Sequence, residues 1–244
     1  MNKNASPCEE NYLMRSLSCV QLKDANNSLA QEAFTIYEDS FPASDRDPVD
    51  RLASLIQQSA DTPVAGESIF RYWIGVSGEQ VLALSIYTYH RQQRLGYLWY
   101  LATAKQYRNQ GIGSWMFTST LAKIREEAPG PPLGLCWEVE RPSDAKDPHQ
   151  RQISEQRIRF YEKNGSILLP TFEFLTPASV DGFPDTYYHL MYYSLQNEST
   201  ISPARIRTLV DVLLLNSYGV KPSSIYYQQA IQSIISMPAG KKYP

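Results

Sequence analysis

The part of the sequence that most constrains the fold is residues 106–113, a short stretch with glycines at positions 111 and 113. It follows a strand-like run at 95–103 and precedes a run at 114–127 whose apolar residues recur at helical spacing. A loop of this kind leaves backbone N–H groups exposed at a helix N-terminus, where an anionic phosphate binds well. Glycine lets that backbone come close to a ligand. The sequence therefore predicts an anion-binding turn between a strand and a helix.

Two common phosphate-binding motifs do not fit this turn. A dinucleotide-binding loop would have a third glycine three residues after the second, and the sequence has Met116 there. A nucleotide-binding P-loop would need Gly-Lys-Ser or Gly-Lys-Thr after a four-residue spacer, which the sequence lacks. The anion is therefore expected to belong to another kind of ligand.

The pattern Arg-x-x-Gly-x-Gly at Arg108, Gly111 and Gly113 resembles the signature loop of the GNAT superfamily of N-acetyltransferases, which grips the pyrophosphate of acetyl-coenzyme A. The preceding residues 97–103 resemble the central strand of that family. Residues 160–165, Phe-Tyr-Glu-Lys-Asn-Gly, resemble the Phe-Tyr-x-x-x-Gly ending of its fourth helix. The resemblance runs from about residue 17 to residue 194.

This resemblance implies an α+β fold with a mixed, mostly antiparallel sheet flanked by helices. It also implies acetyl-CoA as the acyl donor and a reaction without a metal ion. The expected cofactor contacts come from the end of the central strand and from the glycine loop: Leu101, Ala102, Thr103, Arg108, Asn109, Gln110, Gly111, Ile112, Gly113 and Ser114. Backbone N–H groups near Leu101 would stabilise the oxyanion, and Arg108 would bind the pyrophosphate.

The resemblance also assigns catalytic roles. Tyr161 occupies the position of the family tyrosine that donates a proton to the coenzyme A thiolate, and a phenol is a suitable donor to a thiolate of similar basicity. The alternative is that Tyr161 packs in the core of an amphipathic helix, next to Ile158.

The general base is harder to assign, because residues 97–103 contain no carboxylate. Glu138 and Glu140 on the next predicted strand are the nearest candidates, and their spacing places both on one face of the sheet. They could instead form an exposed polar face paired with Arg141 or Arg159. Asp144 and His149, in the following loop, are further candidates.

Hydrophobic periodicity and turn residues divide the chain into a flexible tail (1–15), a GNAT-like domain (16–194) and a small C-terminal helical appendage (195–244). Within the domain, strands are expected at 18–22, 69–76, 81–90, 95–103, 133–140, 166–174 and 186–194. Helices are expected at 30–39, from Pro48, at 114–127, 151–163, 202–216 and 223–236.

Composition limits the environment and the partners. The net charge of −2 and the pI near 6.0 give no basic field for nucleic acid or an anionic membrane. The three cysteines, Cys8, Cys19 and Cys136, form neither a disulfide framework nor a zinc motif. The sequence also contains neither a signal-like N-terminus nor a long apolar run. We therefore expect a cytoplasmic protein.

The expected reaction is direct transfer of an acetyl group, or a longer acyl group, from its CoA thioester to a primary amine. The acceptor could be a small molecule, an amino acid or a peptide N-terminus. Because the central strand contains no carboxylate, a non-catalytic acyl-CoA-binding module is the alternative. The apolar stripes of the appendage, among them Val210, Leu213 and Ile234, could mediate a homodimer or pack against the main domain.

Overall fold

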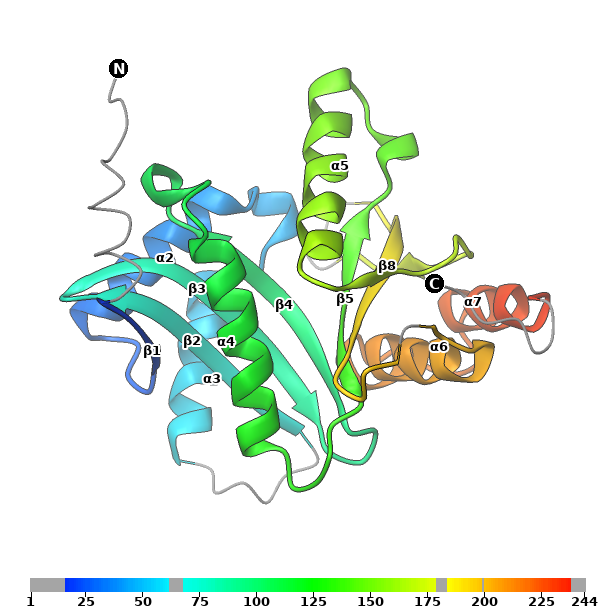
Figure 1. Cartoon of the computed structure of the whole chain (residues 1–244). Coiled ribbons are helices and arrows are strands. Elements are labelled where there is room, and N and C mark those ends of the chain that lie inside the picture. Colours follow the sequence, from blue (N-terminus) through cyan, green and yellow to red (C-terminus); the bar gives the residue numbers. More distant parts are fainter. Residues whose placement is uncertain (1–15, 62–67, 179–183, 199, 238–244) are drawn as a thin grey trace. The chain divides into compact units, whose positions relative to one another are not determined.

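A computed structural model describes residues 16–61, 68–178, 184–198 and 200–237 (Figure 1). The predicted tail at 1–15, which includes Cys8, lies outside the described residues. Contacts divide the chain into two units. The first unit extends to Thr88 and also includes Leu98–Glu127, and the second comprises Tyr89–Tyr97 and the chain from Ala128. The division into domain and appendage after residue 194 stays a prediction.

The fold is α+β, as predicted, with a mostly antiparallel sheet of eight strands. The strand order is β1-β2-β3-β4-β5-β8-β6, and β7 pairs with β8. The strands are β1 (Leu17–Gln21), β2 (Ser68–Ser77), β3 (Gln80–His90), β4 (Leu95–Thr103), β5 (Gly134–Glu140), β6 (Ile167–Leu168), β7 (Leu175–Thr176) and β8 (Thr186–Ser194).

The first unit surrounds β2, β3 and the later part of β4 with α2 (Ser28–Ser40), α3 (Val49–Asp61) and α4 (Ile112–Glu127). In Figure 1, α4 crosses one face of these strands, and α2 and α3 lie behind them. Alternation along the strands explains this layering. Ile74 and Leu84 join the apolar cluster that includes residues of α2 and α3, and Ser85 accepts a 2.8 Å hydrogen bond from Thr120 of α4.

The ends of the helices follow local chemistry. Asn27 caps α2, because its side chain accepts a 2.8 Å hydrogen bond from the N–H of Ala30. The predicted helix after Pro48 is α3. The Asp47 carboxylate before it accepts a 3.1 Å hydrogen bond from the Tyr100 hydroxyl and forms an ion pair with Arg51.

The second unit is built around β5 and β8, which pair antiparallel from Gly134↔Ser194 to Glu140↔Tyr188. Close approach of β8 requires a glycine at the start of β5, because a Cβ on Gly134 would lie 2.3 Å from the Tyr193 carbonyl oxygen. On its other side β5 pairs in parallel with β4 over three residue pairs, Leu95↔Gly134 to Tyr97↔Cys136.

Three predicted elements differ from the structure. The helix predicted from residue 151 is α5 (Pro148–Lys163), because Asp147 accepts a 2.9 Å hydrogen bond from the Gln150 N–H and proline suits the first turn. The strand predicted at 166–174 is reduced to β6, since Pro170 has no N–H for a ladder. The helix predicted at 202–216 changes character after Val210.

That third element is α6 (Pro203–Val210), which is capped by Ser202 and followed by a π-helical turn at Asp211–Ser217. The turn is closed by a 2.9 Å hydrogen bond from the Tyr218 N–H to the Leu213 carbonyl. The next helix is α7 (Ile225–Ile235), which lies beside α6 (Figure 1). Val210, Leu213 and Leu214 are fully buried within the second unit.

Among the described helices, none combines the length and apolar character needed to cross a bilayer.

Candidate active site

The glycine loop has the backbone geometry of a turn into a helix. A 3₁₀ turn at Lys105–Tyr107 leads to Asn109 and Gly111, which have positive φ angles of 63° and 81°. A positive φ is readily available to glycine and tolerated by asparagine. The first hydrogen bond of α4 runs from the Trp115 N–H to the Gly111 carbonyl at 3.0 Å. The N–H groups of residues 112–114 therefore precede the intrahelical ladder and are placed to bind an anion.

Arg108 is held at the entrance of this turn. Its Nε donates to the Thr103 carbonyl at 3.1 Å, and one terminal nitrogen donates to the Ser40 hydroxyl at 3.3 Å. The residue is exposed, and a guanidinium has five N–H donors. Because these two bonds engage only part of that donor set, the side chain is positioned and still able to bind an anion.

The predicted contacts at the end of β4 differ in accessibility. Ala102 is 7% exposed and belongs to the apolar cluster of the first unit, so only its backbone could contact a ligand. Leu101 and Thr103 are half-buried. The role predicted for the N–H groups near Leu101 stays a prediction.

Tyr161, the predicted acid, is 6% exposed on α5. Its ring packs on Trp137 of β5, with the ring centroids 4.5 Å apart. Burial raises the pKa of the phenol, Arg157 lowers it and Glu140 raises it. The side chain is therefore a protonated phenol at neutral pH, and it takes part in core packing as well.

The two candidate bases have different surroundings. Glu140 forms an ion pair with Arg157 of α5, and both side chains are more than a third exposed. The partners suggested by the sequence, Arg141 and Arg159, were wrong: Arg159 pairs with Glu155, and Arg141 donates to backbone carbonyls, including that of Tyr188 at 3.2 Å. Helix α5 places Arg157, rather than Arg159, against the end of β5.

Glu138 lies among hydroxyl groups. Its Oε1 is enclosed and has no hydrogen-bond partner among the described residues. Burial raises the pKa of Glu138 from 4.5 to about 7, and the nearby hydroxyls of Tyr97 and Tyr218 limit the rise. An enclosed carboxylate with a pKa near neutrality can accept a proton under physiological conditions.

Two features of the sites were missed by the sequence analysis. Tyr218 follows the π-helical turn, in a stretch with no motif, so no local signal indicated its contact with Glu138. Asp47 is 6% exposed and its backbone N–H donates to the Tyr100 hydroxyl at 3.0 Å, which places a carboxylate beside β4. The four-residue spacing to Arg51 is a local signal that could have indicated an ion pair, but nothing in the sequence indicated Tyr100.

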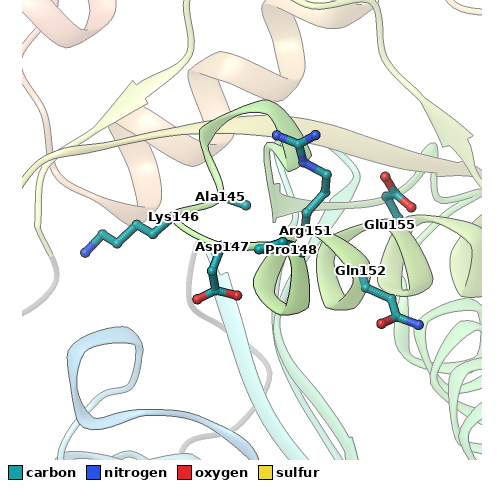
Figure 2. Close-up of a pocket in the computed structure, with 7 residues that line it drawn as sticks. All are labelled: Ala145, Lys146, Asp147, Pro148, Arg151, Gln152 and Glu155. Carbon is teal, nitrogen blue, oxygen red and sulfur yellow. The ribbon is translucent and has the colours of Figure 1, made fainter.

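A surface pocket of about 310 Å³ lies at the N-terminal end of α5 (Figure 2). It is lined by Ala145, Lys146, Asp147, Pro148, Arg151, Gln152 and Glu155. None of the predicted acid, base or cofactor residues lines it. Among the described residues, no group of three or more His, Cys, Asp and Glu side chains is arranged to hold a metal ion.

Comparison with known proteins identifies the domain. Residues 30–130 match the family model described as the acetyltransferase (GNAT) family, and this range includes the glycine loop and all of β4 and α4. The chain carries a GNAT acetyltransferase domain. The resemblance inferred from the glycine loop is therefore confirmed. No protein of curated function matches the sequence significantly.

Solved structures share the GNAT fold. A protein assigned to the GNAT acetyltransferases of Bacteroides thetaiotaomicron has 20% identity and a TM-score of 0.55, with 78% of this chain and 92% of that chain covered. An aminoglycoside 6'-N-acetyltransferase complexed with coenzyme A has 12% identity and a TM-score of 0.52, with 74% and 98% covered. A spermidine N-acetyltransferase chimera, in part from Vibrio cholerae, has 11% identity and a TM-score of 0.51, with 74% and 96% covered.

Proposed function

We propose that the protein transfers an acetyl group from acetyl-CoA to a primary amine by direct attack of the amine on the thioester. The observation that carries the proposal is the loop from Arg108 into α4, where two left-handed residues and a positioned guanidinium precede a helix N-terminus. The GNAT family match over residues 30–130 supports acetyl-CoA as the ligand of this loop.

In this proposal the backbone N–H groups of residues 110–114 and the Arg108 guanidinium bind the pyrophosphate. Charge-assisted bonds from a guanidinium to phosphate oxygens are short and can be bidentate. Gly111 supplies the left-handed turn, and the partial positive charge at the N-terminus of α4 adds to the attraction. The thioester then reacts at its carbonyl carbon.

The chemical step requires a neutral amine and a protonated leaving group. An alkylamine is a cation in neutral water, so a base must remove a proton before or during attack. The amine nitrogen forms a bond to the carbonyl carbon, the carbon–sulfur bond breaks, and the sulfur leaves with the electron pair. We assign the proton of the ammonium group to Glu138, directly or through water, and the proton for the thiolate to Tyr161; the second proton that nitrogen loses as the amide forms restores the Tyr161 phenol.

Glu138 is favoured over Glu140 as the base. Each carboxylate has one enclosed oxygen without a hydrogen-bond partner among the described residues. Glu138 is distinguished by burial, which raises its pKa to about 7, whereas Glu140 is engaged by the Arg157 guanidinium. That ion pair gives Glu140 a structural role that does not require catalysis. Tyr161 is assigned as the acid from its place in the Phe-Tyr-x-x-x-Gly ending of α5, although burial raises the pKa of its phenol and so makes it a weaker proton donor than an exposed tyrosine.

The acceptor is proposed as a primary amine without further identity. Titles of two solved structures that share the fold describe acetyltransferases of an aminoglycoside and of spermidine, which are amines. At 12% and 11% identity these neighbours support the fold alone, so the acceptor has to be identified by experiment.

The test is release of coenzyme A thiol from acetyl-CoA, measured with a thiol reagent across a panel of polyamines, aminoglycosides, amino acids and peptides. We expect amine-dependent thiol release and an acetylated product of matching mass. Glu138→Gln should abolish turnover, and Glu140→Gln, the matched control on the same strand, should retain it. Binding of acetyl-CoA without thiol release for any amine would favour the non-catalytic module instead.

A further inference from the structure

The start of β3 supports the segment that leads into the glycine loop. The Tyr107 hydroxyl, one residue before Arg108, donates a 2.9 Å hydrogen bond to Oε1 of Gln80, the first residue of β3. Three residues earlier, the Ala104 N–H donates to the Leu82 carbonyl, also at 2.9 Å. The 3₁₀ turn between β4 and the glycines is therefore tied to β3 from both of its ends.

Tyr107 is held by its ring and its backbone as well as by its hydroxyl. The side chain is half-buried and packs against the apolar cluster of the first unit. The backbone N–H donates to the Ala104 carbonyl at 2.8 Å, which closes the 3₁₀ turn. Because all three parts of the residue have a partner, Tyr107 fixes the point from which the Arg108 side chain extends.

The partner of the Tyr107 hydroxyl lies on backbone that is itself anchored. Val81, the residue after Gln80, is buried, and its N–H donates a 3.1 Å hydrogen bond to the Glu32 carboxylate of α2. A hydrogen bond restrains a loop best when the acceptor cannot move with it. Helix α2, the start of β3 and Tyr107 thus form one connected path to the glycine loop.

The residues after Tyr107 adopt a conformation that benefits from such support. Asn109 has a φ angle of 63°, which a residue with a side chain adopts less readily than glycine and which persists when its surroundings hold it. Within the loop, the Gln110 side chain donates to the Gln106 carbonyl at 3.2 Å. A site that is ordered beforehand loses less conformational freedom when its ligand binds, so it binds that ligand more tightly.

We propose that Tyr107 is a positioning residue for the cofactor, and that it acts through its hydrogen bond to Gln80. The proposal rests on the function proposed above, in which the glycine loop binds the pyrophosphate of acetyl-CoA. Tyr107 holds the backbone from which Arg108 and the N–H groups of residues 110–114 reach the anion. The sequence gave no sign of this bond, since 27 residues separate its two partners.

The experiment measures binding of coenzyme A by isothermal titration calorimetry, which needs no acceptor amine. Tyr107→Phe keeps the ring and removes the hydroxyl, and Gln80→Leu removes the acceptor on the other side of the same bond. Tyr37→Phe is the matched control, because the Tyr37 ring lies in the same apolar cluster and its hydroxyl donates to the Asp47 carbonyl at 3.1 Å. Thermal unfolding confirms that each variant is folded.

Tyr107→Phe and Gln80→Leu should each weaken coenzyme A binding about threefold to tenfold, the range for loss of one hydrogen bond. The double variant should bind no more weakly than either single variant, because both changes remove the same bond. Tyr37→Phe should keep the wild-type affinity. With an acceptor amine, KM for acetyl-CoA should rise and kcat should stay near the wild-type value.

The same change in an Arg108→Ala background separates positioning from a general structural effect. If Tyr107 acts through the groups that it positions, Tyr107→Phe should weaken binding less when the guanidinium is already absent, whereas independent effects would add. Wild-type affinity in Tyr107→Phe would overturn the proposal, and so would an equal loss in both backgrounds.

The outcome for the proposed function is read separately. Wild-type protein that binds coenzyme A but releases no thiol from acetyl-CoA with any amine would refute acetyl transfer, and the affinities of Tyr107→Phe and Gln80→Leu would still decide the role of Tyr107. Wild-type protein that does not bind coenzyme A would overturn both proposals.

Discussion

Replacing Glu138 with glutamine should reveal the free-energy cost of burying its charge. Burial raises the pKa of this carboxyl from 4.5 to about 7. The folded state therefore binds more protons than the unfolded state between these values, and stability falls as pH rises through this window. The shift of about 2.5 units, at 1.36 kcal/mol per unit, corresponds to about 3 kcal/mol. Glutamine does not titrate. The stability of Glu138→Gln relative to wild type should therefore rise by about 3 kcal/mol as the pH increases through this window.

The assay is urea unfolding of both proteins at intervals from about pH 4 to about pH 8, with the free energy of unfolding obtained at each pH. At each pH, the free energy of unfolding of wild type is subtracted from that of the variant. The change of this difference with pH is informative, because the contributions of all other titrating groups cancel. Glutamine has nearly the volume of glutamate and can still accept a hydrogen bond from Tyr97 or Tyr218, so the fold should survive.

Glu140→Gln is the control, because Glu140 lies two residues along the same strand with a side chain that is 39% exposed and paired with Arg157. Exposed ion pairs contribute little to stability. The difference in the free energy of unfolding between Glu140→Gln and wild type should therefore change by less than about 1 kcal/mol over the same pH range. If Glu138→Gln and wild type have parallel stability profiles from acid to neutral pH, Glu138 titrates as an ordinary surface carboxyl, and the argument for it as an enclosed base is wrong.

Three further substitutions test the remaining assignments. Arg108→Ala should raise the apparent KM for acetyl-CoA about tenfold or more through loss of charge-assisted bonds, whereas Ser40→Ala, which removes only a partner of the guanidinium, should not. Tyr161→Phe should lower turnover by roughly 10²-fold with acetyl-CoA affinity retained, and unchanged turnover would exclude the acid role. Burial lowers the pKa of His90 from 6.5 to about 4, so wild-type stability should fall as pH drops through that window. Urea unfolding should show that His90→Gln removes up to about 3 kcal/mol of this dependence, and an unchanged dependence would contradict it.

The strands and turns around the cofactor loop could be predicted because their signals are local. Alternating apolar residues predicted β2, β3 and β4 to within one residue at each end. The glycines of the loop placed the start of α4 at residue 114, two residues too late, because only Gly111 lies in the left-handed turn and Gly113 is already helical. Where the signal was interrupted by proline, as after residue 166, the strand prediction was too long.

The surroundings of the candidate base could not be predicted, because they depend on which distant elements meet. The sequence indicated that Glu138 and Glu140 share a face, but it could not show that α5 places Arg157 on one and that Tyr218 reaches the other. The π-helical turn before Tyr218 could not be predicted from the sequence either. Its residues suit an ordinary helix, and the wider hydrogen-bond spacing becomes visible only in the structure.

The contrast between the two glutamates explains why a base would be placed beside phenols. Glu140 forms an ion pair with the Arg157 guanidinium, whereas no ion pair of Glu138 is found among the described residues. Phenol hydroxyls stabilise the charged form, but without a full positive charge, so burial remains the dominant influence on Glu138. Hydroxyls can therefore fix the direction of the carboxylate while leaving it basic enough to accept a proton near neutral pH. A central strand without a carboxylate is then compatible with catalysis, provided that the next strand supplies one.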